Sequence, residues 1–274
     1  ATGRPWDYDA PRYRRVAQAR QHEQNRMLAY TTSTGCRLEF LRRELDDAHA
    51  RECGRCDNCT GTRPDTTIGP AAHQAAQTAL RRPGVEFAPR RMWPTGLAAT
   101  GVDRSGKIPP EWRAEPGRAL ARMSDIGWGA ALRALFDTDT DTPVPGDMFD
   151  AVVQVLASWQ WDRRPSAVVS LGSRTRPRLV NGLAGSLASL GKMDYLGALR
   201  RTGSHTSRNP SGTNSAQRLR QVCDGFTADF DIPSTAVLLV DDLRDSGWSL
   251  TEAAMTLRRA GAEAVYPLAL ALDA

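Results

Sequence analysis

Four of the five cysteines lie close together and have the clearest chemistry in the chain. Cys36, Cys53, Cys56 and Cys59 follow the spacing C-x16-C-x2-C-x2-C. Two residues between cysteines let neighbouring sulfurs turn toward one ion, and four thiolates suit a tetrahedral Zn²⁺. Because four protein ligands leave no open position, the sequence predicts one structural zinc ion. Two disulfides or four free thiols are the alternatives, but disulfides need an oxidising compartment and the chain shows no signal peptide.

A pair of acids follows an apolar segment near the end of the chain. The run over 235–240 leads into Asp241 and Asp242, and the small-residue turn Asp245–Ser249 comes next. A strand that passes through such a turn into a helix aims backbone N–H groups and the positive helix end at a phosphate. The two carboxylates can accept hydrogen bonds from a ribose diol. The alternative is that the paired aspartates only cap a buried strand.

Alternating strands and helices must position these acids. The pattern predicts strands over 167–171, 193–199, 235–240 and 264–272, and helices over 179–190, 216–224 and 250–257. Such alternation predicts an α/β domain with a parallel sheet and with ligands at the carboxyl ends of the strands. The polar stretch 200–215 is long for a plain connection, so it is expected to be disordered or to act as a lid.

Two helices, over 8–32 and 36–47, are expected to pack beside each other and to position the cysteines. Arginines surround the predicted metal site: Arg37, Arg42, Arg43, Arg51, Arg55 and Arg63. A tetrathiolate zinc site carries a net charge of about −2, because four thiolates surround one divalent ion. The arginines either neutralise this charge or contact phosphates, and the sequence leaves both interpretations open.

A linker over 62–70 separates the two regions by its turn chemistry. After it the sequence predicts a helix over 71–82, an edge strand over 85–87 and a helix over 149–161. Arg90, Arg91 and Trp93 are candidates for a wing that meets duplex DNA, with the arginines on phosphates and Trp93 on a base. The alternative is that Trp93 covers a small core and the arginines are solvated.

The composition sets broad limits. The chain has 274 residues, a formal net charge of +5 and a pI of about 9.2, and its only lysines are Lys107 and Lys192. Arginine suits phosphate recognition, although a mild basic excess is also common in proteins that touch no nucleic acid. No apolar run is long enough to span a membrane, so we expect a cytoplasmic protein.

The cysteine region resembles the zinc-binding subdomain of RecQ-family DNA helicases over about residues 12–60. The resemblance rests on the helix that contains Gln24–Tyr30, the Cys36-Arg37 pair and the run from Cys53 to Cys59. It implies an ATP-driven helicase that binds DNA at single-strand and duplex junctions, near the nucleoid and without sequence preference. It also implies a winged helix after the zinc module. No G-x-x-x-x-G-K-[ST] loop is present, so we expect the ATPase motor to lie upstream in a longer protein.

The acidic region resembles type I phosphoribosyltransferases, which use phosphoribosyl pyrophosphate (PRPP), over about residues 165–274. Asp241 and Asp242 match the vicinal acids of that family. The 5′-phosphate loop is matched by Asp245, Ser246, Gly247, Trp248 and Ser249, and the turn with Ser173, Arg174, Thr175 and Arg176 falls where the pyrophosphate loop lies. The resemblance implies PRPP or nucleotide binding with Mg²⁺, a lid over 200–215, and Asp245 as the catalytic base. The bulky Trp248 and the short chain after the last strand depart from the pattern.

These observations predict a multidomain α and α/β protein. The expected parts are a helical zinc-binding module over 1–63, a winged-helix-like α+β connector over 64–162, and an α/β phosphoribosyltransferase-like domain with a parallel sheet over 163–274. The expected function is the C-terminal half of a RecQ-like helicase. The alternative is a free-standing phosphoribosyltransferase of nucleotide metabolism with an accessory zinc module.

Overall fold

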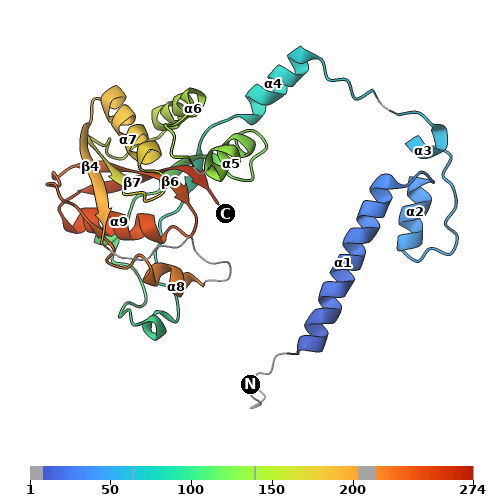
Figure 1. Ribbon diagram of the computed structural model, residues 1–274, viewed down its shortest axis with the longest axis horizontal. Coiled ribbons are helices and arrows are strands. Elements are labelled where there is room, and N and C mark those ends of the chain that lie inside the picture. The colour runs from blue at the N-terminus through green and yellow to red at the C-terminus, as the bar shows by residue number, and fades with distance from the viewer. Residues whose placement is uncertain (1–8, 64, 139, 203–213, 274) are drawn as a thin grey trace. The chain divides into compact units, whose positions relative to one another are not determined.

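A computed structural model describes residues 9–63, 65–138, 140–202 and 214–273, and the chain divides into two compact units, Ala1–Gly69 and Pro70–Ala274 (Figure 1). No helix in these described ranges is both long enough and apolar enough to cross a bilayer.

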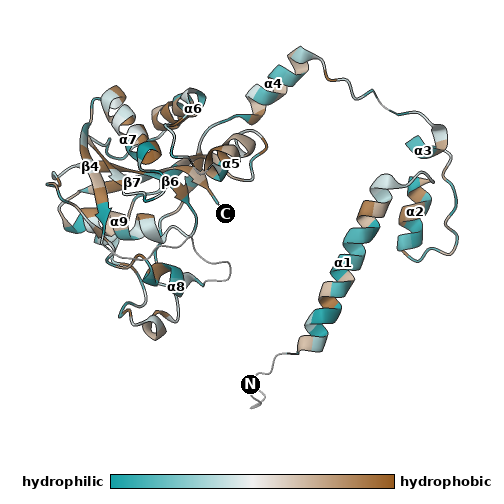
Figure 2. Ribbon diagram, in the orientation of Figure 1, coloured by the Kyte–Doolittle hydropathy of each residue, from teal (hydrophilic) through white to brown (hydrophobic). Residues whose placement is uncertain are grey.

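The first unit is helical. It contains α1 (Ala10–Thr32), α2 (Arg37–Glu44) and the single turn α3 (Asp57–Thr60). Asp9 caps α1 by accepting a hydrogen bond from the backbone N–H of Arg12, at 2.9 Å. None of the three helices contains a buried residue, and α1 is mostly hydrophilic along its length (Figure 2). The unit therefore has little apolar core among its described residues, and its stability must come largely from polar contacts and the cysteines.

The second unit is built on a mostly parallel sheet. Among the described residues its strand order is β1-β2-β7-β6-β3-β4-β5, with β2, β7, β6, β3 and β4 parallel and β1 and β5 antiparallel at the edges. The strands are β1 (Val85–Phe87), β2 (Gly117–Arg122), β3 (Ala167–Leu171), β4 (Asp194–Arg201), β5 (Phe226–Thr227), β6 (Ala236–Arg244) and β7 (Ala264–Leu272). Every residue of β3 and β7 is buried. Such continuous apolar strands form because helices cover both faces of a parallel sheet.

Helices cover the sheet from both sides (Figure 1). On one face α5 (Gly129–Asp137), α6 (Gly146–Ala157) and α7 (Pro177–Gly191) share an apolar cluster with Val168, Leu238 and Leu268. On the other face α9 (Trp248–Arg259) packs on Val169 and Leu239. Neighbouring residues of one strand point to opposite faces, which accounts for the two separate clusters.

A third cluster lies beside α9. It joins the short helix α8 (Ser215–Arg220) and the 3₁₀ turns η1 (Leu97–Thr100) and η2 (Pro110–Trp112) to Trp248. The remaining helix, α4 (Pro70–Leu80), is exposed and begins the second unit.

The structure differs from the expected connector over 64–162 and the expected domain start at 163. Strand β1 pairs with β2, and β2 pairs in parallel with β7, where Ala119 lies opposite Ala269. The segment that was expected to form a winged helix therefore supplies one edge of the α/β sheet. The pairing joins residues far apart in the chain, so no local pattern in the sequence indicates it.

Candidate zinc centre and phosphate site

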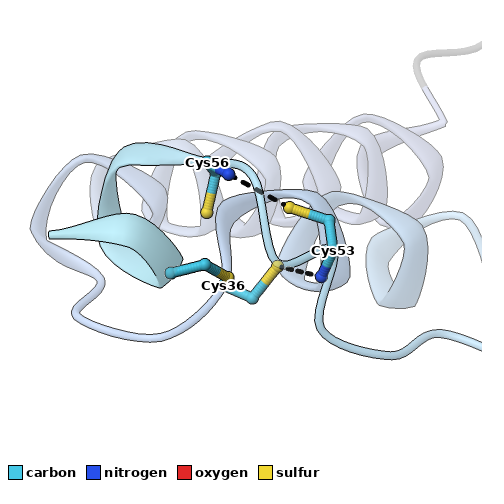
Figure 3. A group of neighbouring side chains, drawn as sticks. Cys36, Cys53 and Cys56 are labelled. Atoms are coloured by element: carbon cyan, nitrogen blue, oxygen red, sulfur yellow. Dashed lines mark hydrogen bonds between the residues drawn. The ribbon is translucent and has the colours of Figure 1, made fainter. Parts of the chain in front are cut away.

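The four cysteines come together as the spacing predicts. Their sulfur atoms all lie within 4.8 Å of one another, and Figure 3 shows those of Cys36, Cys53 and Cys56 directed toward one another. Four sulfurs around a tetrahedral Zn²⁺ are about 3.8 Å apart when each Zn–S bond is about 2.3 Å, so this cluster fits the ion. Cys36 is buried at the N-cap of α2, and its Sγ accepts from the backbone N–H groups of Glu39 (3.4 Å) and Cys53 (3.2 Å).

The residues between the cysteines fasten this loop to the helices. Arg37 donates from Nε to both oxygens of Asp57, at 2.8 and 2.9 Å, and from Nη1 to the carbonyl of Tyr30. The Asn58 amide donates to the carbonyls of Ser33 and Gly35, at 2.7 and 2.8 Å. Both contacts fix the second half of the cysteine run against the end of α1.

The thiols interact electrostatically as a group. A backbone hydrogen bond from Glu39 lowers the pKa of Cys36, and one from Arg37 lowers the pKa of Cys56 to about 6. The hydrogen bond with Cys56 is the main cause that raises the pKa of Cys59 to about 12. Neighbouring thiolates repel one another, so all four ionise together only when a cation is bound between them. A Zn²⁺ ion would supply that charge and hold the loop closed.

The arginines around this site fall into two groups. Arg37, Arg42 and Arg43 form ion pairs with Asp57, Asp47 and Glu39 at 2.5 to 2.8 Å. The other three, Arg51, Arg55 and Arg63, are exposed, and no ion pair is described for them. The first group is therefore neutralised by carboxylates, and the second group is available to a phosphate backbone.

The acids of the second unit lie where the direction of the sheet connections reverses. Strands β3 and β6 are parallel neighbours, with Ser170 opposite Val240. Strand β3 leads into α7 on one face of the sheet and β6 leads into α9 on the other. In an open α/β sheet such a point leaves a crevice at the carboxyl ends of the strands, where ligands bind. The turn Gly172–Arg176 therefore lies at the same edge of the sheet as Asp241 and Asp242.

A glycine is required where the first of these turns begins. A Cβ atom on Gly172 would lie 2.2 Å from the carbonyl oxygen of Leu199 on β4. Further along this turn, Ser173 Oγ accepts from the backbone N–H of Arg176 at 3.0 Å. Arg174 and Thr175 at its tip are exposed.

The two aspartates are poorly solvated. Asp241 is only 5% exposed, and burial raises its pKa well above the usual range, with a further increase from the neighbouring Asp242. Burial also raises the pKa of Asp242. The side chain of Arg201, at the end of β4, lowers the pKa of Asp241 and donates to the carbonyl of Gly172 at 2.7 Å. A buried and a half-buried carboxyl side by side at the end of β6 suit a ligand that brings hydroxyl groups or a cation.

The two helix N-termini at this edge differ. At α7 the carboxylate of Asp141 accepts from the backbone N–H groups of Arg178 (2.6 Å) and Leu179 (3.0 Å). At α9 the N-cap is Gly247, with φ of 79°, and no side chain caps the helix. The α9 terminus is therefore the one that keeps its N–H groups and its partial positive charge for an anion.

Trp248 does not obstruct this turn. Its side chain is 1% exposed and stacks on Trp93 with ring centroids 6.1 Å apart, while Nε1 donates to Ser215 Oγ at 2.9 Å. The bulky residue thus points into the third apolar cluster and leaves the backbone of the turn accessible.

The three candidate DNA contacts do not form a wing. Arg90 donates from Nε (3.1 Å) and Nη2 (2.5 Å) to the carbonyl of Ser246 and lies over the Trp248 ring at 4.7 Å. Trp93 is 8% exposed, so its ring cannot stack on a base. It packs in a small core instead, which was the alternative interpretation of the sequence. Of the three, Arg91 is exposed. Arg90 instead supports the turn before α9.

Several cationic residues of this edge were missed from the sequence. Arg218 on α8 contacts both oxygens of Asp245, at 2.7 and 2.9 Å, so the expected catalytic base is held in an ion pair. Burial lowers the pKa of Arg244, and the nearby Arg90 and Arg122 lower it further. The Nε atoms of Arg176 and Arg218 are buried without a described hydrogen-bond partner. The expected lid over 200–215 is described only in part. Arg200 at its start forms an ion pair with Asp229, and residues 203–213 lie outside the described residues.

Comparison with known proteins gives one family match. Residues 9–60 match the family model described as RecQ zinc-binding, which confirms the resemblance of the cysteine region. No curated protein matches the chain.

Among solved structures, the chain is similar to three phosphoribosyltransferases. Orotate phosphoribosyltransferase from Aeropyrum pernix is 21% identical, with a TM-score of 0.23, over 53% of this chain and 58% of that one. Adenine phosphoribosyltransferase from Leishmania tarentolae is 11% identical, with a TM-score of 0.32, over 76% of this chain and 94% of that one. Adenine phosphoribosyltransferase from Leishmania donovani is 10% identical, with a TM-score of 0.32, over 72% of this chain and 80% of that one.

Proposed function

We propose that the second unit binds PRPP, or a 5′-phosphorylated nucleotide, at the carboxyl edge between β3 and β6. One observation carries this proposal: the buried Asp241 and the half-buried Asp242 lie at the reversal point of the sheet, between the turn Gly172–Arg176 and the uncapped N-terminus of α9. A phosphorylated sugar needs these three parts, since two anion sites flank acceptors for its diol.

The charges of the edge support a polyanionic ligand. Burial lowers the pKa of Arg201, and the nearby Arg174 lowers it further. The pKa of Arg244 is likewise lowered by burial and further by the neighbouring Arg90 and Arg122. Partly buried guanidinium groups that destabilise one another are relieved when an anion binds among them. Mg²⁺ would be held mainly by the pyrophosphate of the ligand and by water, as its octahedral geometry prefers.

Ribosyl transfer is a separate step from binding. In that step the bond from C1 of the ribose to pyrophosphate breaks and a bond to an incoming nitrogen forms. The pyrophosphate leaves with the bonding electrons, and a base takes the proton of the nitrogen. Asp245 is the candidate base, but its carboxylate is already engaged in an ion pair with Arg218. Binding is therefore the better supported half of the proposal.

For the first unit we infer DNA binding within a RecQ-like helicase whose ATPase lies outside this chain, with the protein acting in the cytoplasm on nucleoid DNA. The support is the match of residues 9–60 and the exposed Arg51, Arg55 and Arg63. If these arginines follow a phosphate backbone, DNA affinity should fall steeply with salt and depend little on base sequence. A chain that binds no DNA at low salt would contradict this inference.

Calorimetry tests the PRPP site. Wild-type protein titrated with PRPP and Mg²⁺ should release or absorb heat with a saturable isotherm, and the Asp241→Asn, Asp242→Asn double variant should bind at least about 10-fold more weakly, because the diol loses charged acceptors. Arg91→Gln is the matched control, since this exposed residue lies outside the crevice. Equal isotherms from wild type and the double variant, or heat from neither, would rule out the site.

A further inference from the structure

Asp245 places a negative charge in the turn that we assign to the 5′-phosphate. A carboxylate there would repel the phosphate of a ligand unless a cation offset it. The Arg218 guanidinium does so, because its Nη1 lies 2.7 and 2.9 Å from the two carboxylate oxygens. The two residues belong to different elements, the turn before α9 and helix α8.

Arg218 keeps hydrogen-bonding capacity beyond this ion pair. A guanidinium carries five N–H donors in a planar fork that matches phosphate oxygens. Its Nε is buried with no hydrogen-bond partner within the described part of the chain, while the side chain as a whole is 28% exposed. Because Nε is closed to solvent, the donors that remain for a ligand oxygen are those on the Nη groups that Asp245 does not use.

Helix α8 is anchored to the same turn. Ser215, its first residue, accepts the hydrogen bond from Trp248 Nε1, and Ala216 and Leu219 pack in the cluster that contains the Trp248 ring. A capping box between Asn214 and Gln217 fixes the start of the helix. The position of Arg218 is thus tied to Trp248, which is itself a residue of the turn.

We propose that Arg218 is a ligand-binding residue of this site: it donates directly to a phosphate monoester held on the Asp245–Ser249 turn while it offsets the charge of Asp245. This inference rests on the proposed function, because it assigns a residue to the same site. The ligand class is a sugar 5′-phosphate. The pyrophosphate group of PRPP would lie instead at the turn Gly172–Arg176, so Arg218 acts on one end of the ligand.

Titration of the intact chain with ribose 5-phosphate, and separately with pyrophosphate and Mg²⁺, distinguishes the two ends. Arg218→Gln should bind ribose 5-phosphate about 10-fold more weakly, the effect of losing one charge-assisted hydrogen bond, and should bind pyrophosphate like wild type. Arg220→Gln is the control on the same helix, since its Nε donates to the Thr100 carbonyl away from the turn. It should bind both probes like wild type.

The Asp245→Asn, Arg218→Gln double variant separates direct contact from charge compensation. Direct donation predicts that ribose 5-phosphate binding stays weak in the double variant. Recovery to the wild-type affinity, an unchanged affinity in Arg218→Gln, or equal losses for both probes would overturn the assignment. A wild-type chain that binds neither probe would overturn the proposed function as well, which distinguishes that failure from a failure of Arg218 alone.

Discussion

At the scale of single residues, the buried carboxyl of Asp241 is held at a cost to stability. Burial and the neighbouring Asp242 raise its pKa, so the folded chain binds a proton more tightly than the unfolded chain does. The stabilisation from that proton is present below the unfolded pKa of about 3.9 and is lost as the pH rises through the folded value. The ionised form of Asp241 is therefore disfavoured in the folded chain relative to the unfolded chain.

Asp241→Asn should therefore stabilise the protein at neutral pH, because an amide needs no ionisation and Asp242 remains to face Arg201 and Arg176. Thermal unfolding should show a rise in Tm of about 2–4 °C at pH 8, which corresponds to about 1 kcal/mol. The rise should shrink as the pH falls toward 4. A variant that is less stable at pH 8 than wild type would show that Asp241 is held by favourable contacts in its ionised form.

The cysteine site and the acidic pair were the parts of the molecule easiest to predict from sequence, because their residues are close together in the chain. Spacing alone brings Cys53, Cys56 and Cys59 together, and an apolar strand carries its own acids. Arg218 has no such signal, since it meets Asp245 from a different helix 27 residues away. The burial of Trp93 depends likewise on its contact with Trp248, which only the fold provides.

At the scale of elements, α1, α2 and α3 depend on the predicted metal, because none of them contains a buried residue. Elemental analysis should find one zinc per chain. Chelation, or Cys56→Ser, should unfold residues 9–60 and leave the second unit folded, because structural zinc contributes on the order of 10 kcal/mol to small modules. Circular dichroism follows the lost helix, and Cys223→Ser in the second unit should keep both zinc and helix. Full helix content in zinc-free protein would refute this dependence.

The segment before β2 is fastened to α9 by a partly buried cluster of charges. Arg104 contacts Glu252 at 2.6 Å and Asp224 at 2.5 Å, and its guanidinium lies over the Trp93 ring. The side chain of Arg104 is 15% exposed and that of Glu252 is 1% exposed. The same segment carries Arg90, which supports the turn at the start of α9.

Arg104→Ala should cost about 3–5 kcal/mol, because it leaves Glu252 buried without its cation. Urea unfolding followed by tryptophan fluorescence measures this loss. Arg91→Ala on the same segment is exposed and should change the stability by less than about 0.5 kcal/mol. Similar midpoints for the two variants would show that the ion pair contributes little to the docking of this segment.

The sheet illustrates why whole-domain boundaries were harder to predict than its strands. The four parallel strands expected over 167–171, 193–199, 235–240 and 264–272 are present as β3, β4, β6 and β7; β3 and β7 have the expected bounds, and the ends of β4 and β6 are shifted. Strand β2 was missed because its parallel partner β7 lies at the other end of the unit. Parallel pairing needs a crossover connection, so neither strand carries a local signal for the other.

At the scale of the whole molecule, the chain joins a helical unit with a four-cysteine cluster and exposed arginines to an α/β unit built on a mostly parallel sheet. The two units are stabilised separately, the first around its cysteines and the second by a sheet that helices cover on both faces. Loss of zinc should therefore leave PRPP binding intact, and loss of the acidic pair should leave DNA binding intact.

Hydrogen–deuterium exchange of the intact chain, with and without PRPP and Mg²⁺, tests the location of the ligand site most directly. Slower exchange is expected over 173–175 and 245–249, in the two turns that flank Asp241 and Asp242, because a bound ligand takes up their backbone N–H groups. Residues 153–165, which lead into the opposite end of β3, should exchange as in the free protein. No change at the two turns with saturating ligand, or protection confined to other segments, would contradict the account.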